Sequence, residues 1–247
     1  MAKIDKTLAE TARVLFGEEL SPISRYEDWL ASRVPRVRMK KSCLTGKPVP
    51  TPAHSIFSLV PDGMVAELGM LKHASGLKAD VNEEDSFGSM SQKMPKISLY
   101  ITELAEGENI EVVDSAVYLN LSNAYKIVDV FTSKNVGLGF FNDYNDHAFG
   151  IGRSASCSFS IHCYNSKSLT RCFEADFCRN CSDIMFCHNC ENVRESLFCC
   201  NVKNLRNAIF NKQVSKEEYL RVKKILVEWI LSELKKNGRL PIDIYDF

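Results

Sequence analysis

The feature that most constrains this sequence is a short repeat that runs through its second half. Small or aliphatic residues recur as anchors, and the residues before each anchor fall into register. Successive anchors are separated by 12, 12, 9, 12, 15, 9 and 12 residues, always a multiple of three. Self-similarity at a fixed short spacing points to a repeat architecture. The eight anchors are Ala124, Val136, Ala148, Cys157, Leu169, Ile184, Val193 and Leu205.

Two polar columns accompany these anchors. The residue directly before each anchor is a short polar side chain or an imidazole, and asparagine stands four positions before five of the eight anchors. Asparagine and aspartate favour turns, and units this short need neighbours to bury an apolar face. The repeat therefore predicts a β-solenoid in which asparagine amides stack from turn to turn. The spacing of alternate anchors favours two repeat units per turn, with a three-walled solenoid left open.

The flanking segments predict an α+β protein with three parts. Residues 1–94 form a helical and mixed N-terminal region, 95–213 the solenoid, and 214–247 a C-terminal helix and tail. Ser215 and Glu218 form a capping box at the start of that helix, its apolar stripe ends before Gly238, and we expect it to cap the last turn. The N-terminal pattern predicts helices over 3–20 and from Ser21-Pro22 to 33, a strand at 56–60, a helix over 64–71, a mobile loop over 75–94 and a strand at 97–102.

Cysteine usage is the unusual part of the composition. Nine of the ten cysteines lie between Cys157 and Cys200, and only Cys43 lies elsewhere. The charged N-terminus does not resemble a signal peptide, and no apolar run is long enough to span a membrane. We therefore expect a cytoplasmic protein, free or within a larger intracellular or virion assembly. In such a compartment, clustered cysteines indicate buried thiols, a metal or redox chemistry rather than disulfides.

The cysteine spacing leaves these alternatives open. Two C-x-x-C pairs resemble zinc knuckles, yet two units per turn would place the pairs on opposite corners of the solenoid, about 10 Å apart. A second possible set of four metal ligands would then combine Cys178 and Cys181 with Cys199 and Cys200. Serine, isoleucine and valine occupy the same columns in other copies, which favours reduced thiols filling small core positions and no cofactor. The candidate zinc or iron–sulfur ligands are Cys178, Cys181, Cys187, Cys190, Cys199 and Cys200.

Other polar and aromatic residues give weaker signals. Asp143, Asp146 and His147 could form an acid/base group like that of β-solenoid carbohydrate-active enzymes, but the same residues suit turns. His162 and His188 adjoin cysteines and could be ligands, but single histidines at turn positions are more often exposed, so we expect both to face solvent. Aromatic residues are concentrated between 140 and 164, where most should belong to the core and any outward ring would offer a docking surface.

Charge excludes one class of partner. The chain carries 31 basic and 31 acidic side chains, so it lacks the basic field of a nucleic-acid-binding protein. A basic run from Arg33 to Lys41 is interpreted as a solvated segment balanced by the acidic stretch Glu83 to Asp85, with a phosphate-binding arm as the alternative. We expect a protein partner or a homo-oligomer, and neither a membrane nor a nucleic acid.

One resemblance covers roughly residues 113–224. The strings Leu205-Arg206-Asn207, Phe210-Asn211-Lys212-Gln213 and Ser215-Lys216-Glu217-Glu218-Tyr219 resemble the C-terminal tail of cysteine-rich repeat proteins found in prokaryotic and phage-like genomes. Such relatives often carry zinc-ribbon-like cysteine pairs ahead of the repeat, where this chain has only Cys43. The resemblance implies no particular activity.

These observations favour a non-catalytic structural or interaction protein that presents a rigid solenoid surface to a protein partner. The first alternative is a protein that holds zinc or an iron–sulfur cluster with its clustered thiolates. The second is a solenoid hydrolase or lyase with carboxylates near Asp143.

Overall fold

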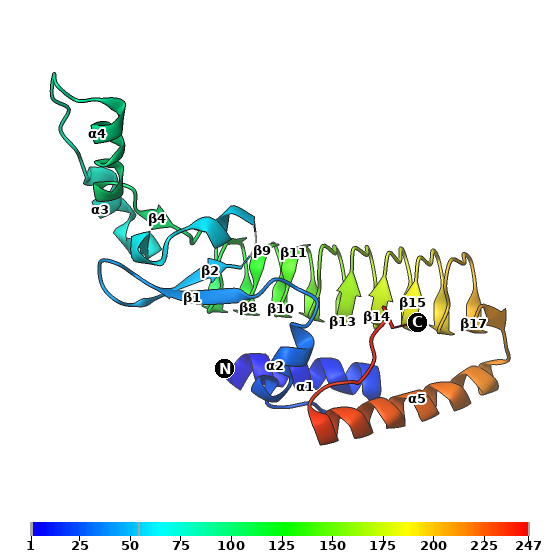
Figure 1. The fold of residues 1–247 in the computed structure, drawn as a ribbon. Coiled ribbons are helices and arrows are strands. Elements are labelled where there is room, and N and C mark those ends of the chain that lie inside the picture. Colours follow the sequence, from blue (N-terminus) through cyan, green and yellow to red (C-terminus); the bar gives the residue numbers. More distant parts are fainter. Residues whose placement is uncertain (1, 54, 247) are drawn as a thin grey trace.

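The computed structural model describes residues 2–53 and 55–246, so Met1, His54 and Phe247 lie outside the description. As the repeat predicts, the second half is a β-solenoid of about nine turns (Figure 1). Its long sheet runs, in spatial order, through β18 (Lys212–Gln213), β17 (Arg206–Ile209), β16 (Arg194–Leu197), β15 (Ser182–His188), β14 (Phe173–Asp176), β13 (Ser158–Tyr164), β12 (Asp146–Phe149), β10 (Lys134–Gly137), β8 (Ser122–Tyr125) and β6 (Ile110–Val113). A shorter sheet contains β11 (Phe140–Asp143), β9 (Val128–Phe131), β7 (Tyr118–Leu119) and β5 (Ala105–Glu106).

One turn of the solenoid contains 12 residues. Lys134 pairs in parallel with Ser122 on one side and with Asp146 on the other, and the same register continues to β17. This corrects the prediction of two repeat units per turn, because each 12-residue repeat is already a complete turn. The turn length is constant, and the anchors come from two positions of the turn that lie three residues apart. The spacings of 9 and 15 residues arise where the series of anchors changes from one of these positions to the other.

The backbone explains the asparagine columns. From Asn120 to Phe210 every third residue has a positive φ, so each turn contains four triplets and the coil is four-sided. Both predicted polar columns, exemplified by Asn120 and Asn123 with φ of 52° and 53°, are these left-handed positions. Asparagine and aspartate tolerate this conformation better than most residues do. Local backbone geometry, and not amide stacking alone, therefore selects these residues.

Each triplet directs one side chain into the solenoid. In one turn these are Cys181, Ile184, Cys187 and Cys190, all of which are buried. With only four inward side chains per turn, the interior is narrow and favours small residues. These side chains form one apolar core, and a second core lies between the outside of the long sheet and the helices.

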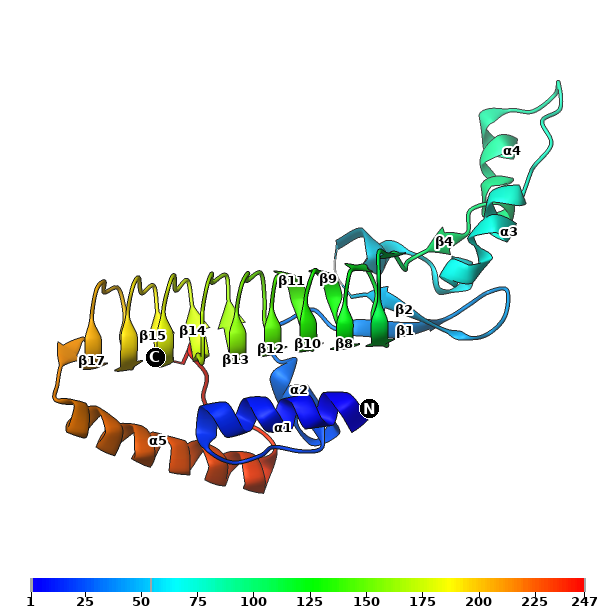
Figure 2. The ribbon, with the colours of Figure 1, turned by 180° about the vertical axis from the view of Figure 1, so that it is seen from behind.

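Three helices cover one side of the solenoid. Helices α1 (Ala2–Phe16), α2 (Ile23–Leu30) and α5 (Lys216–Asn237) lie along the long sheet (Figures 1 and 2). They pack on outward apolar residues such as Phe149 and Phe173, which are fully buried. Helix α5 begins and ends where the sequence predicts: Ser215 Oγ accepts the Glu218 N–H at 3.1 Å, and Gly238 closes the helix with a φ of 69°.

Helix α5 lies along the solenoid and not across its end. It begins beyond the last turn and runs back along the long sheet toward α2, because the outward apolar column of that sheet needs cover. The last turn is covered instead by the antiparallel strand β18 and by the side chain of Asn211. The Asn211 amide accepts the Cys200 N–H at 2.8 Å and donates to the Cys200 carbonyl at 2.9 Å. This amide replaces the backbone of a further turn and protects the open edge.

The segment before the solenoid forms a projecting arm, residues 55–104, at its N-terminal end (Figures 1 and 2). Three expectations here are wrong: a 3-10 helix covers most of 56–60, 64–71 is mostly 3-10 helix around a short strand, and the strand at 97–102 shortens to two residues. The expected loop at 75–94 contains one five-residue helix. Among the side chains that the structure describes here, the buried apolar ones are Val65 and Ala66, so no core imposes a hydrophobic period. The elements are η1 (Ser55–Leu59), η2 (Asp62–Met64), β3 (Val65–Ala66), η3 (Leu68–Met70), α3 (Leu71–Gly76), α4 (Phe87–Ser91), η4 (Met94–Lys96) and β4 (Tyr100–Ile101), and β1 (Val37–Lys41) and β2 (Pro48–Pro52) form a hairpin before them.

The expected N-cap of the second helix is replaced by a contact between helices. Pro22 takes the N-cap position of α2, so Ser21 does not cap it. The first free N–H, from Ile23, is instead accepted by Asp5 Oδ1 of α1 at 2.7 Å. None of the helices in residues 2–53 and 55–246 is sufficiently long and apolar to cross a membrane.

Candidate functional site

The clustered cysteines occupy two different environments. Eight of the nine between 157 and 200 take the inward position of their triplet and are buried. Cys200 takes an outward position and is exposed, as is Cys43 in the loop between β1 and β2. The structure therefore removes Cys200 from any ligand set that the interior thiols could form.

Interior thiols act as hydrogen-bond donors to the backbone. The Cys178 thiol lies 3.3 Å from the carbonyl oxygen of Asp176, two residues before it, and 3.4 Å from that of Cys187, nine residues after it. The Ser154 hydroxyl has the equivalent acceptors, the carbonyls of Gly152 and Cys163, at 3.3 and 3.2 Å. Serine and cysteine thus satisfy the same carbonyls, which explains why they alternate in these columns.

Interior side chains also accept hydrogen bonds from the next turn. Ser166 Oγ accepts the Cys178 N–H at 3.2 Å, and the amide oxygen of Asn142 accepts the Ser154 N–H at 3.1 Å. Both donors lie 12 residues after their acceptors and are buried. Because a buried N–H without a partner is costly, small polar residues inside the solenoid have a structural role.

The candidate ligands are arranged differently from the sequence prediction. The side chain of Cys178 contacts those of Cys181 and Cys190, and that of Cys187 contacts those of Cys190 and Cys199. The 12-residue register makes Cys190, and not Cys199, the neighbour of Cys178 on the next turn, and the two C-x-x-C pairs meet instead of lying on opposite corners. The five thiols form a continuous run. Within the described part of the chain, however, no group of three or more histidine, cysteine, aspartate or glutamate residues is arranged to hold a metal ion.

Burial and contact between neighbouring thiols shift the pKa values of the interior cysteines in both directions. Burial raises the pKa of Cys157 to about 12 and raises that of Cys163 as well. For Cys178, contact with Cys181 and Cys190 raises the pKa first, and burial adds to it. Hydrogen bonds from Cys178 and Cys187 lower the pKa of Cys181, Cys190 and Cys199. The thiols with a raised pKa are donors to carbonyls and poor metal ligands.

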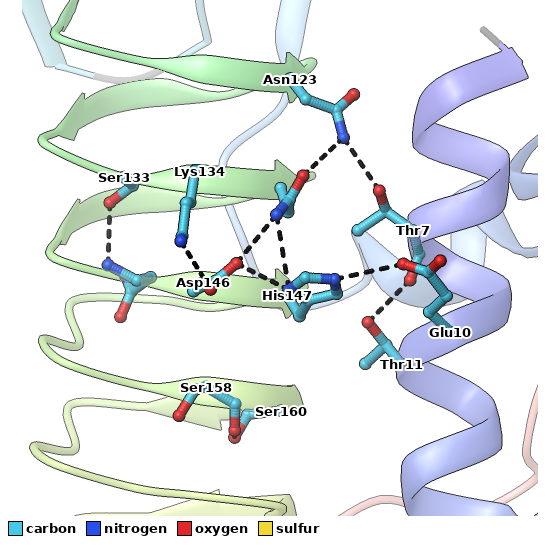
Figure 3. Close-up of polar contacts among 12 residues, drawn as sticks. Thr7, Glu10, Thr11, Asn123, Ser133, Lys134, Asp146, His147, Ser158 and Ser160 are labelled. Carbon is cyan, nitrogen blue, oxygen red and sulfur yellow. Dashed lines mark hydrogen bonds and ion pairs between the residues drawn. The ribbon is translucent and has the colours of Figure 1, made fainter.

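The predicted acid/base group is a contact between α1 and the solenoid (Figure 3). His147 Nδ1 lies 2.6 Å from Asp146 Oδ1, and its Nε2 lies 3.4 Å from Glu10 Oε2 on α1. Nearby, the Asn123 amide donates at 2.9 Å to Thr7 Oγ1. Both ring nitrogens of His147 therefore face carboxylates within the protein, and the group holds α1 on the sheet.

Asp143 lies apart from this contact. It belongs to β11 in the shorter sheet, whereas Asp146 and His147 belong to β12 in the long sheet. Its Oδ1 atom is buried and makes no hydrogen bond within the described residues. The structure thus does not bring the three residues together as one acid/base group.

Of the two histidines expected to face solvent, His162 does not. His162 is buried, and its Nδ1 lies 2.6 Å from the carboxylate of Glu174, which is buried as well. The other oxygen of Glu174 accepts the Ile244 N–H at 3.0 Å. The pair therefore fixes the C-terminal tail to the solenoid, and the expectation that His162 faces solvent is wrong because α2 and the tail cover its turn.

Three residues of the basic run pair with carboxylates outside the acidic stretch. Asp85 in the acidic stretch pairs with Lys93 of the same arm, so the predicted balance between the two stretches is wrong. Carboxylates elsewhere pair with the basic run: Arg33 with Asp243 at 2.7 Å, Arg36 with Asp28 at 2.7 Å and Lys40 with Asp62 at 2.9 Å.

One group of neighbouring side chains was not predicted from the sequence. Asp176, His188 and Cys200 hold the same outward position on three consecutive turns, and the last two line a groove beside the C-terminal tail. Their spacing of 12 residues is visible in the sequence, but it carries meaning only once the turn length is known. Comparison with known proteins adds no further candidate, because neither protein-family models nor curated proteins match the chain.

Proposed function

We propose that this chain is a non-catalytic interaction protein in which the solenoid is the rigid body and the projecting arm binds a protein partner. The observation that carries the proposal is the exposure of large apolar side chains on the arm. Leu59 is 80% exposed, Val81 76% and Phe87 84%. Isolated exposed apolar residues are ordinary, but several on one projecting element favour a binding surface.

Rigidity of the solenoid supports this division of roles. Polar side chains on its surface connect turn to turn, as in the 2.8 Å bond from the Asn189 amide to Asn201 and the 2.6 Å pair of Arg171 with Asp183. Each turn is also paired through the backbone to both neighbours. A body of this kind presents regular surfaces for assembly.

Affinity capture from a lysate of the source organism, with quantification of the retained proteins, tests the proposal. We expect one protein to be retained in near-stoichiometric amount by the wild type and lost with the double variant Leu59→Ser/Phe87→Ser. The matched control is Leu220→Ser, which alters an exposed leucine on α5, away from the arm. Equal retention by the double variant and the wild type, or no retained protein, contradicts the proposal.

Light scattering of the purified chain shows whether the arm binds a second copy of this chain or a different protein. A monomer that remains monomeric at high concentration supports a different protein as partner. A dimer that the arm variant abolishes identifies a second copy of this chain as the occupant instead.

A further inference from the structure

A groove of about 530 Å³ lies between the outside of the last turns and the C-terminal tail. Its apolar lining includes Phe186, Phe198, Phe210, Ile244 and Tyr245. The three phenylalanines are spaced 12 residues apart and stack, with ring centroids 5.5 and 5.1 Å apart and interplanar angles of 12° and 14°. Phe210, at the end of the stack, is 71% exposed. The groove therefore offers an apolar wall that opens to solvent at the last turn.

A column of Asp176, His188 and Cys200 runs beside this wall. Asp176 pairs with His188, and His188 with Cys200, in the parallel register of three consecutive turns. Neighbouring strands lie about 4.8 Å apart, so the three side chains leave the same face of the solenoid on successive turns, with His188 on the middle one. His188 Nδ1 is 3.3 Å from Asp176 Oδ2, on the side of the preceding turn. Phe177 packs edge-on against the ring, with centroids 6.0 Å apart.

The solvent exposure of the side chains increases along this column. The Asp176 side chain is 3% exposed and that of His188 is 40% exposed, while Cys200 is an exposed residue. His188 and Cys200 both line the groove. A buried carboxylate, an imidazole that faces it and an accessible thiol, in that order on consecutive turns, are the residue types that activate a nucleophile.

Cys200 contrasts with the other cysteines of the repeat. The interior thiols are buried and donate to carbonyls, whereas Cys200 faces a groove that a ligand can enter. Partial burial raises the pKa of the Cys200 thiol, so its reactivity near neutral pH requires a neighbouring base. The imidazole of His188 on the adjacent turn is suited to that role.

We propose that Cys200 is a nucleophilic thiol, assisted by His188, that accepts the acyl group of an acyl thioester whose apolar chain lies along the phenylalanine wall. His188 takes the proton from Sγ, and the sulfur attacks the thioester carbonyl carbon. A new carbon–sulfur bond forms as the old one breaks, and the leaving thiolate takes the proton from His188. The products are S-acyl Cys200 and a free thiol, and no oxidation or reduction occurs.

The choice of an acyl thioester follows from the lining. Five apolar or aromatic side chains beside a single thiol fit a hydrocarbon chain better than a charged ligand. Transfer between two sulfurs also needs neither an oxidant nor a metal. Asp176 is a positioning residue in this arrangement, since it acts through the imidazole.

The test incubates the full-length protein with alkyne-tagged palmitoyl-CoA and follows acylation of each cysteine by peptide mass mapping. Cys43 is the internal control, because it is exposed and belongs to a different element. We expect Cys200 to be acylated at least about tenfold faster than Cys43, with a bond that hydroxylamine cleaves. His188→Gln should lower the Cys200 rate by about tenfold or more while the Cys43 rate stays unchanged.

Two further variants examine the groove and the carboxylate. Phe210→Ala should slow acylation by palmitoyl-CoA but not by acetyl-CoA, because only the long chain reaches the exposed end of the wall. Asp176→Asn should shift the pH profile of the Cys200 rate, a readout that a purely structural carboxylate would not move. The proposal is overturned if Cys200 reacts no faster than Cys43, or if His188→Gln leaves its rate unchanged.

Discussion

At the scale of single residues, the solenoid is governed by a left-handed backbone position in every triplet. Asn180 and Asn192 hold φ of 52° and 55° at such positions, which asparagine adopts with little strain. Bulkier residues adopt the same conformation where neighbouring turns support them, as Phe186 and Phe198 do by stacking. Residue choice therefore reflects either backbone tolerance or support from the next turn.

The left-handed position gives a direct prediction at Asn180. Asn180→Val should lower the free energy of unfolding by about 1–2 kcal/mol, because a β-branched side chain clashes with the backbone at positive φ. Asn180→Gly, the matched control, should leave stability nearly unchanged, since glycine adopts this conformation freely. Urea unfolding of the two variants measures the difference. Equal loss in both would contradict the backbone explanation.

Buried thiols predict a loss of stability at alkaline pH. Burial raises the pKa of Cys157 from its ordinary value of 9.0 to about 12, so the thiol stays protonated in the folded protein while the unfolded chain ionises. Its contribution is fully present below pH 9 and is lost as the pH rises from about 9 towards 12, at about 1.4 kcal/mol per pH unit. Cys157→Ser should flatten the alkaline slope of the unfolding free energy by about this amount. An unchanged slope would show that this thiol does not titrate as a buried group.

At the scale of elements, the sequence predicted which segments form helices better than where those helices pack. The capping box and Gly238 located α5 correctly, because both signals are local. Its position along the sheet depends on the outward apolar column that includes Phe149, Phe173 and Leu197. The sequence shows spacings in multiples of three but not which position of each triplet points inward, so these residues could not be distinguished from inward ones. The position of α5 therefore could not be inferred from the sequence.

The packing of α5 can be tested within one helix. Leu234 is fully buried against the second core, whereas Leu220 is exposed on the same helix. Leu234→Ala should lower the free energy of unfolding by about 2–5 kcal/mol, and Leu220→Ala by less than about 0.5 kcal/mol. Comparable losses in both would contradict the placement of α5 along the sheet.

At the scale of the whole molecule, the repeat predicted a β-solenoid but not its turn length. Anchors from two neighbouring columns were read as one series, so the inferred neighbours of Cys178 were wrong, and the column of Asp176, His188 and Cys200 was not recognised. The interior cysteines could be interpreted as core thiols from the sequence alone, because serine occupies the equivalent positions in other copies of the repeat. The arm could not be predicted, because few of its side chains are buried and its local pattern carries little information.

The central claim is that the cysteine cluster is the buried core of a rigid solenoid and not a metal site. Thiol titration of the protein purified without added metal, combined with elemental analysis, tests it most directly. The account predicts two reactive thiols in the folded protein, Cys43 and Cys200, all ten after unfolding, and no bound metal. About one zinc or iron per chain that survives dialysis, together with interior thiols that react only after chelation, would contradict it.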